Sequence, residues 1–278
     1  MPSLNAIGAA ALAAVLAMTI SASAQDAAKY PDWSRQWRRA ENGPNRYDPN
    51  KPPGRAQEAP LTPEYRAIYE ASLADQAAGG QGNNPSARCI PRGMPGVMTF
   101  NQPAEFVITP DVTYVMFSNT LPRRIYTDGR GWPADGAEPG FSGYSIGKWL
   151  DTDGDGRFDT LEIETRDMKG PRAFDNQGTP THKDNQTVVN ERIYLDKADR
   201  DLLHNDITTI DHALTRPWTV NKTYRRQSTV WVDNICGENN NHVEIAGEQY
   251  LTGGDGRLMP TRKDQPPPDL RHFNQAPK

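Results

Sequence analysis

The sequence predicts a mainly β protein with one helix near its N-terminal side: either an antiparallel, lipocalin-like β-barrel or a β-sandwich. After Cys89, short runs rich in β-branched and aromatic residues alternate with turn residues, a pattern typical of antiparallel sheets. Asp-Gly pairs, which favour tight turns, occur at 128, 155 and 255 among these runs. The predicted strands, in order, are EFVIT, VTYVMFS, RRIYT, LEIET, TVVNERIYL, DITTID, STVWV and HVEIAGEQYL.

A helix is expected over residues 62–78. Thr62 is a suitable N-cap, Pro63 suits the first helical position, and Gly79-Gly80 ends the pattern. Its apolar face would consist of Tyr65, Ile68, Tyr69 and Leu73.

The first 24 residues have the features of a secretory signal peptide. An apolar run from Ile7 to Ile20 precedes Ala22-Ser23-Ala24, an A-x-A cleavage site, although no Lys or Arg precedes the run. A membrane anchor is the alternative, but the run falls short of the ~20 residues that a spanning helix needs. We therefore expect a bacterial periplasmic or secreted protein, cleaved near Ala24, without a membrane span after cleavage.

The mature chain divides into three parts. Residues 25–60 are rich in Pro, Arg and Trp and predict an extended arm, which Trp33 and Trp37 would pin to the body. Residues 61–258 form one β-rich domain, and residues 259–278 form a Pro-rich tail. The 31 basic and 35 acidic residues give a net charge of -4, which argues against a nucleic-acid partner.

The chain has two cysteines, Cys89 and Cys236. In an oxidising compartment such a pair most simply forms one disulfide. A thiol metal site or a catalytic thiol is the alternative, but neither a CxxC spacing nor a Cys-adjacent His supports it.

Residues 151–162, DTDGDGRFDTLE, match the calcium-loop pattern D-x-[DN]-x-[DN]-G-x5-E. Alternate residues of such a loop direct oxygens toward a hard cation, and Gly156 permits the sharp turn. The flanking segments lack helical periodicity, so we expect a structural Ca²⁺ between strands; a turn that binds no ion is the alternative. The predicted ligands are Asp151, Asp153, Asp155, Arg157 through its carbonyl, Asp159 and Glu162.

A second polar cluster lies in RRIYTDGR. Arg124, Tyr126, Asp128 and Arg130 are alternate residues, so an extended segment would direct all four to one side. That side is either solvated or the lumen of a barrel, where the cluster would bind an anionic or carbonyl-bearing ligand. Glu191 and Arg192 lie on opposite faces of their strand, so only one can join such a lumen.

The candidate catalytic residues are His182, Asp184 and Tyr126. THKDN places a His beside a carboxylate just before a strand, an arrangement that suits a general base, although an exposed turn histidine is at least as common. A separate, fourth candidate is Ser145 in GYSIG, which fits the G-x-S-x-G nucleophile elbow of serine hydrolases. Its surroundings lack the strand and helix that this elbow requires.

The chain resembles a widespread set of uncharacterised exported bacterial proteins with no established activity, through seven segments that follow one another in the same order. They are CIPRGMP, RRIYTDGR, GYSIGKW, LEIET, NERI, RPW and CGEN, between Cys89 and Asn239. The resemblance implies export and a single domain. Its usual members have a short acidic turn where this chain has the calcium pattern, which implies that calcium is particular to this branch.

Three functions remain open at this stage. The first is a calcium-stabilised β-barrel of the cell envelope that binds, or also transforms, a small organic molecule. The second is a non-catalytic, calcium-braced structural or interaction protein. The third, least favoured, is a serine hydrolase that uses Ser145.

Overall fold

The structure is a computed structural model, and it describes residues 28–40, 59–99, 102–170, 173, 178–232, 234–236 and 241–270. The predicted signal peptide and most of the predicted arm lie outside these residues.

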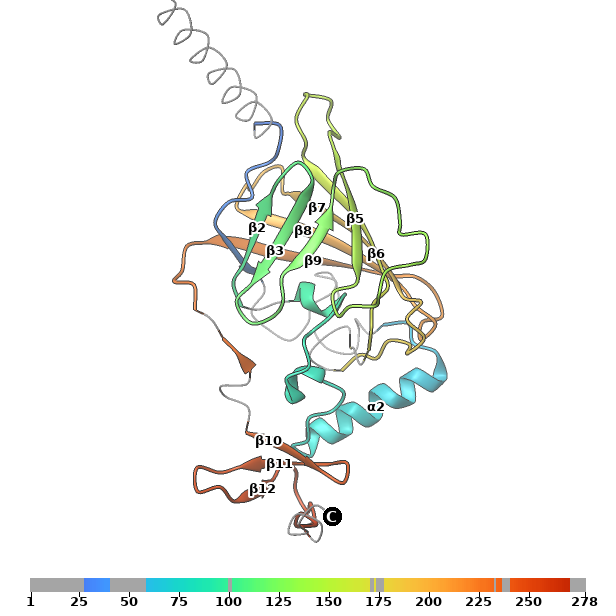
Figure 1. The fold of residues 1–278 in the computed structure, drawn as a ribbon, viewed down its shortest axis with the longest axis vertical. Helices are drawn as coiled ribbons and strands as arrows, with labels where there is room; N and C mark the ends of the chain where they lie inside the picture. The colour runs from blue at the N-terminus through green and yellow to red at the C-terminus, as the bar shows by residue number, and fades with distance from the viewer. Residues whose placement is uncertain are drawn as a thin grey trace, which may run out of the picture.

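The central feature is a closed β-barrel in which the strands follow chain order (Figure 1). Each strand pairs antiparallel with the next, except that β4 and β5 are parallel, and β9 pairs with β1 to close the barrel. The predicted barrel is confirmed, with one parallel pair that the prediction lacked. The strands are β1 (Gln36–Arg39), β2 (Ala104–Ile108), β3 (Val112–Phe117), β4 (Arg123–Tyr126), β5 (Tyr144–Leu150), β6 (Thr160–Arg166), β7 (Val188–Leu195), β8 (Leu202–Ile210) and β9 (Trp218–Gln227).

The parallel pair follows from the long connection between β4 and β5. A hairpin returns the chain antiparallel within a few residues, whereas a parallel neighbour requires a connection of about a dozen residues or more. Residues 127–143 provide this length, and their Gly and Pro residues prevent a strand of their own. The Asp128-Gly129 pair therefore begins a crossover, whereas Asp155-Gly156 lies in the connection between the paired strands β5 and β6.

Three barrel strands, β1, β5 and β9, were missed because their sequences lack clear apolar alternation. β1 lies in the predicted arm, where Trp33 and Trp37 are fully buried, so residues 36–39 of the arm are part of the barrel. β9 reads WTVNKTYRRQ, and its polar residues obscure the inward set that begins with Trp218 and Val220. The predicted strand at 228–232 is wrong: these described residues form no strand, and their apolar side chains are largely exposed.

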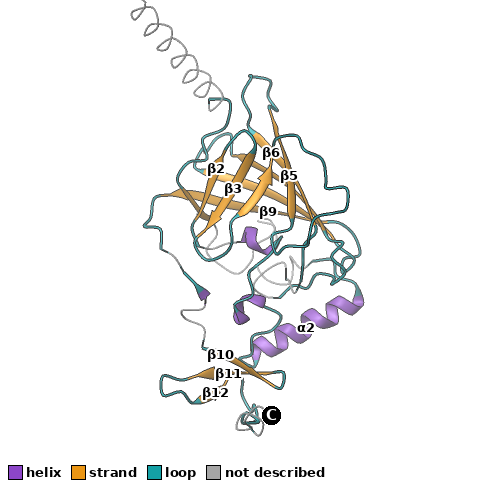
Figure 2. Cartoon of the chain, viewed as in Figure 1, coloured by secondary structure: helices purple, strands orange, loops and turns teal. Residues whose placement is uncertain are grey.

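Helix α2 (Pro63–Ala77) confirms the predicted helix (Figure 2). The Thr62 hydroxyl accepts a hydrogen bond from the Tyr65 amide, as expected of an N-cap. Tyr65 and Tyr69 are buried, but Ile68 is 40% exposed, so the buried face is narrower than predicted. Two 3-10 turns follow, η2 (Pro85–Arg88) and η3 (Gly96–Thr99).

A separate three-stranded sheet lies beyond α2 and away from the barrel (Figure 1). It consists of β10 (His242–Ile245), β11 (Glu248–Thr252) and β12 (Leu258–Pro260). Arg262 forms ion pairs with Asp75 of α2 and with Glu248 of β11, so the sheet contacts the helix. The predicted tail thus begins within a strand.

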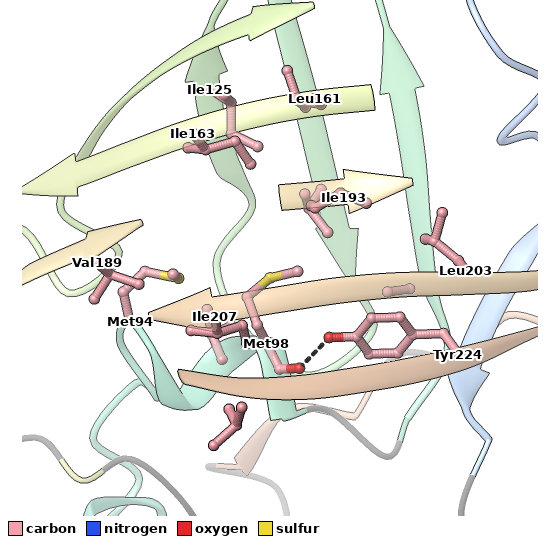
Figure 3. Close-up of a cluster of buried hydrophobic side chains, with 14 of the residues drawn as sticks. Met94, Met98, Ile125, Leu161, Ile163, Val189, Ile193, Leu203, Ile207 and Tyr224 are labelled. Atoms are coloured by element: carbon pink, nitrogen blue, oxygen red, sulfur yellow. Dashed lines mark hydrogen bonds between the residues drawn. The ribbon is translucent and has the colours of Figure 1, made fainter. Parts of the chain in front are cut away.

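The core fills the inside of the barrel with apolar side chains (Figure 3). Met94 and Met98, from the segment around η3, are fully buried against inward residues of several strands, including Ile125 and Leu161. The Tyr224 hydroxyl of β9 donates a hydrogen bond to the Met98 carbonyl at 2.6 Å, which ties this segment to the wall. The interior is therefore a packed core along these residues.

Cys89 and Cys236 form the predicted disulfide across a sequence separation of 147 residues. In the chain-entropy model, closing a loop of this length stabilises the folded state by about 5 kcal/mol. Within the described ranges, no helix has the length and apolar character that crossing a bilayer requires.

Candidate functional site: an outer face of the barrel

A salt bridge between Arg123 and Glu191 is completely enclosed in the barrel. Neither side chain is exposed to solvent, and the guanidinium donates to both carboxylate oxygens at 3.1 and 2.5 Å. Arg123 also donates to the hydroxyls of Ser145 and Thr165, and the Asn205 amide donates to Glu191. These bonds compensate the loss of water that burial imposes on both charges.

The buried position of Arg123 shows which side chains of β4 face the inside of the barrel. Because side chains alternate along a strand, the burial of Arg123 and Ile125 places Arg124 and Tyr126 on the outside. Arg124 is exposed, so the expectation that it faces the lumen is wrong. The alternation itself was correct, but one polar run with two adjacent arginines does not reveal which arginine is inside. Glu191, rather than Arg192, is the member of NERI that points inward.

The other predicted residues of this segment do come together, on the outer face. The Arg130 guanidinium donates three hydrogen bonds of 2.6 to 3.0 Å to the Asp128 carboxylate, and it lies 4.0 Å from the centre of the Tyr126 ring. The Tyr126 ring packs 5.0 Å from Tyr144 of β5. Sequence reasoning missed Tyr144, whose position beside Tyr126 depends on the parallel pairing of β4 with β5.

Two further residues extend this cluster. Trp132, from the crossover, lies 5.9 Å from the Tyr144 ring, and the Arg166 guanidinium lies 4.6 Å from Trp132. Arg166 also pairs with Glu164, its neighbour on the same face of β6. We call Tyr126, Arg130, Trp132, Tyr144 and Arg166 the aromatic–arginine cluster.

A groove of about 600 Å³ lies on the outside of β5 to β8, and Arg166 links the aromatic–arginine cluster to it through its ion pair with Glu164, a lining residue. Tyr144 adjoins the groove along β5. The next outward residue of that strand, Ile146, lines the groove and pairs in register with Glu164, another lining residue. The groove carries both signs of charge beside apolar surface. Its outward-facing lining consists of Ile146, Lys148, Glu162, Glu164, Asn190, Arg192, Asp206 and Thr208.

The hydrogen bonds from Arg130 lower the pKa of Asp128 to about 2. Both carboxylate oxygens are engaged in the same pair, which also raises the pKa of Arg130. The pair therefore stays ionised at any physiological pH. It can attract or orient a ligand, but it does not exchange a proton with one.

The acidic loop folds around its first carboxylate. Asp151 accepts hydrogen bonds from the amides of Gly154, Asp155 and Gly156, and both glycines have left-handed backbone angles. Carboxylate oxygens of Asp151, Asp153 and Asp159 lie within 4.8 Å of one another. Three predicted ligands thus converge, which is the geometry that a hard cation needs.

The remaining predicted ligands, Asp155, Arg157 and Glu162, do not belong to this group of three converging carboxylates. Asp155 and Arg157 are exposed loop residues, and the Asp155 carboxylate accepts a hydrogen bond from the Arg157 amide. Glu162 lies on β6, opposite Lys148, and lines the groove. Burial tends to raise the pKa of Asp159, but hydrogen bonds from Thr152 and Thr160 outweigh it, so its pKa is lowered.

His182 and Asp184 form a second cluster, at the barrel end where β7 begins and β8 ends. The Nδ1 atom of His182 lies 3.1 Å from Asp184 Oδ2, and Nδ1 of His212 lies 2.5 Å from the same oxygen. His212 was missed, because it is close in space only through the pairing of β7 with β8. Tyr126, the third predicted catalytic residue, belongs instead to the aromatic–arginine cluster.

Ser145 has no setting for a nucleophile. It is fully buried on β5, where its hydroxyl contacts Arg123 and Thr165. Close packing explains why GYSIG has glycine at both of its ends. Gly143 has φ +67°, and a Cβ there would lie 2.5 Å from the Arg166 carbonyl, while a Cβ at Gly147 would lie 2.7 Å from Ile125. The pattern therefore reflects packing of the barrel wall.

Comparisons of the chain with protein-family models, with curated protein sequences and with solved structures find no match.

Proposed function

We propose that this protein is exported and binds a small, polar organic molecule on the outer face of its barrel, in the groove beside the aromatic–arginine cluster. The observation that carries the proposal is the ion pair that joins Arg166 of this cluster to Glu164, which lines a groove with hydrogen-bonding groups of both signs. The groove volume falls within the range of about 300–1,000 Å³ that is usual for small-molecule sites.

The chemistry of the lining defines the ligand class. Beside the lining, in the aromatic–arginine cluster, Tyr144 and Trp132 offer flat apolar surfaces, on which an aromatic ring or the apolar face of a sugar packs well. Lys148 and Arg192 attract a carboxylate, and Glu164 and Asn190 accept hydrogen bonds from hydroxyls. We therefore favour an aromatic carboxylate, a phenol or a sugar. The packed interior of the barrel argues against the alternative, a ligand in the lumen.

A binding screen tests this proposal. Aromatic carboxylates, phenols and sugars would be tested against the mature protein by ligand-observed NMR. A ligand of the groove should lose its signal with Tyr144→Ala and with Lys148→Ala. Tyr114→Ala is the matched control, because Tyr114 is also partly exposed on the outside of a strand, β3, but β3 contributes no residue to the groove, whereas β5, which carries Tyr144, contributes Ile146 and Lys148. Ligands that bind all three variants equally would refute the location.

Calcium stabilisation is the second part of the proposal. The three converging carboxylates and the Asp151-centred turn support a Ca²⁺ in the loop. The loop joins β5 to β6 at the barrel end opposite α2 (Figure 1), so the ion would hold two wall strands together. Extracellular modules bind calcium with dissociation constants of about 0.1–1 mM, which suffices outside the cytoplasm.

The expected effect of calcium can be calculated. At about 10 mM Ca²⁺, binding with such constants stabilises the folded state by about 1.4–2.7 kcal/mol. For a chain of this length, that raises Tm by roughly 3–10 °C. Asp151→Asn with Asp159→Asn should remove the shift, whereas Asp135→Asn, an exposed aspartate of the crossover, should keep it. If neither calcium nor chelator changes the Tm of the wild type, the loop is a turn that binds no ion.

Export is supported by the disulfide and by the predicted signal peptide. The resemblance to exported bacterial proteins is consistent with it and is likewise a proposal. The filled barrel interior favours a second candidate, a non-catalytic structural or interaction protein that calcium stabilises. If the ligand screen finds no groove ligand, this second function becomes the better account.

A further inference from the structure

The His182 region contains an arrangement that neither the calcium loop nor the groove explains. We propose that His182, Asp184 and His212, the His–Asp cluster, form a binding site for a divalent transition-metal ion, for which zinc is the natural probe. One potential ligand atom from each of the three residues lies within 4.8 Å of the other two. Two imidazoles with one carboxylate is a ligand set that zinc and related ions use, whereas calcium prefers oxygen alone.

The two distances from the Asp184 oxygen to the histidine nitrogens are close to those of a metal site. A tetrahedral zinc about 2.0–2.1 Å from each ligand holds its ligand atoms about 3.3 Å apart. Nδ1 of His182 and Oδ2 of Asp184 are already 3.1 Å apart. Nδ1 of His212 is 2.5 Å from the same oxygen, a hydrogen-bond distance, and replacing the shared proton by a metal requires an opening of less than about 1 Å.

The backbone that carries these ligands is held by a buried residue, Asp211. One of its carboxylate oxygens accepts hydrogen bonds from the amides of His182 and Ala213, and the other accepts one from the Thr187 hydroxyl. Asp211 therefore fixes the loop before β7 and the turn after β8 relative to each other. Partners outside the ligand shell that orient the ligands are a general requirement of protein metal sites.

Helix α2 supports the same site from its N-terminal end. The Thr62 amide donates to the Ala213 carbonyl at 2.9 Å, which anchors the turn that carries His212. The Tyr65 ring packs 5.4 Å from the His182 ring and limits its orientation. His212 is 64% exposed, so a metal held here would keep at least one position open to water or to another ligand.

The test is a zinc titration of the tag-free mature protein by calorimetry, in a buffer with saturating calcium so that the acidic loop does not contribute. Wild type should bind one zinc ion per chain. His182→Ala, His212→Ala and Asp184→Asn should each weaken binding by roughly tenfold or more, because each removes a direct ligand. His204→Ala is the matched control, since His204 also pairs with an aspartate, Asp196, at 3.1 Å but without a second histidine.

Folding of each variant would be checked by circular dichroism, and Asp184→Asn retains the shape of the side chain it replaces. Cobalt(II) gives an independent readout, because ligation by imidazole nitrogens changes its visible absorption spectrum. The spectrum should change in wild type and in His204→Ala but not in His212→Ala. Absence of zinc binding by wild type, or equal binding by wild type and all three cluster variants, would overturn the proposal.

Discussion

The enclosed salt bridge between Arg123 and Glu191 makes a strong prediction about stability. Replacing Glu191 by Gln keeps the shape of the side chain but removes the negative charge that compensates Arg123. The guanidinium has no exposure to water, so it cannot regain solvation without opening the barrel wall. Breaking a buried pair in this way costs about 3–5 kcal/mol.

The size of the effect depends on the surrounding hydrogen bonds. Ser145 and Thr165 still accept from Arg123 in the variant, which moderates the loss, whereas Asn205 loses the charge on its acceptor. Removing both charges together, as Arg123→Met with Glu191→Met, should cost much less than the sum of the single replacements, because neither buried charge is then left alone. The cycle thus isolates the coupling within the pair.

Urea unfolding followed by tryptophan fluorescence measures these free energies. Arg192→Gln is the matched control, since Arg192 is the next residue on β7 but faces outward. We expect Glu191→Gln to lose about 3–5 kcal/mol and Arg192→Gln to change by under about 0.5 kcal/mol. A loss of under about 1 kcal/mol for Glu191→Gln would show that water reaches the pair, and it would reopen the lumen as a ligand site.

Three further predictions concern the disulfide, pH and packing. Free-thiol counting on denatured, non-reduced protein should find no thiols, and reduction of Cys89–Cys236 should lower the unfolding free energy by up to about 5 kcal/mol; two thiols in the native protein would contradict this. The pKa of Asp128 is lowered from 3.8 to about 2, so its stabilising contribution is present above pH 3.8 and is lost as pH falls toward 2. Asp128→Asn should therefore flatten the acid limb of a stability–pH curve, and an unchanged limb would exclude this pair as a contributor. Gly147→Val should cost about 1–3 kcal/mol in urea unfolding, because a Cβ already meets Ile125 at 2.7 Å; wild-type stability would mean that the wall adapts.

The sequence predicted the features that depend on local chemistry. Thr62 and Pro63 begin the helix as expected, and the Asp155-Gly156 turn joins β5 to β6. The cysteine pairing was also predictable, since only one pairing exists. Each of these depends on neighbouring residues or on simple counting.

Features that depend on the neighbours of a strand were not predictable in the same way. Arg123 and Arg124 are chemically identical, and only the partner Glu191, distant in sequence, decides which one is buried. β9 was missed because one of its inward positions holds Lys222, which interrupts the apolar and aromatic set of Trp218, Val220 and Tyr224. His212 joins Asp184 only through the pairing of β7 with β8.

The central claim is that a ligand binds on the outer face of the barrel and not within it. Chemical-shift mapping of the isotope-labelled mature protein with a ligand from the screen tests this most directly. We predict the largest shifts at Lys148 and Glu164, which line the groove, and at Tyr144, the next outward residue of β5 beyond Ile146. Largest shifts at Glu191 and Asn205, with none on the outer face, would place the ligand inside the barrel and contradict the account.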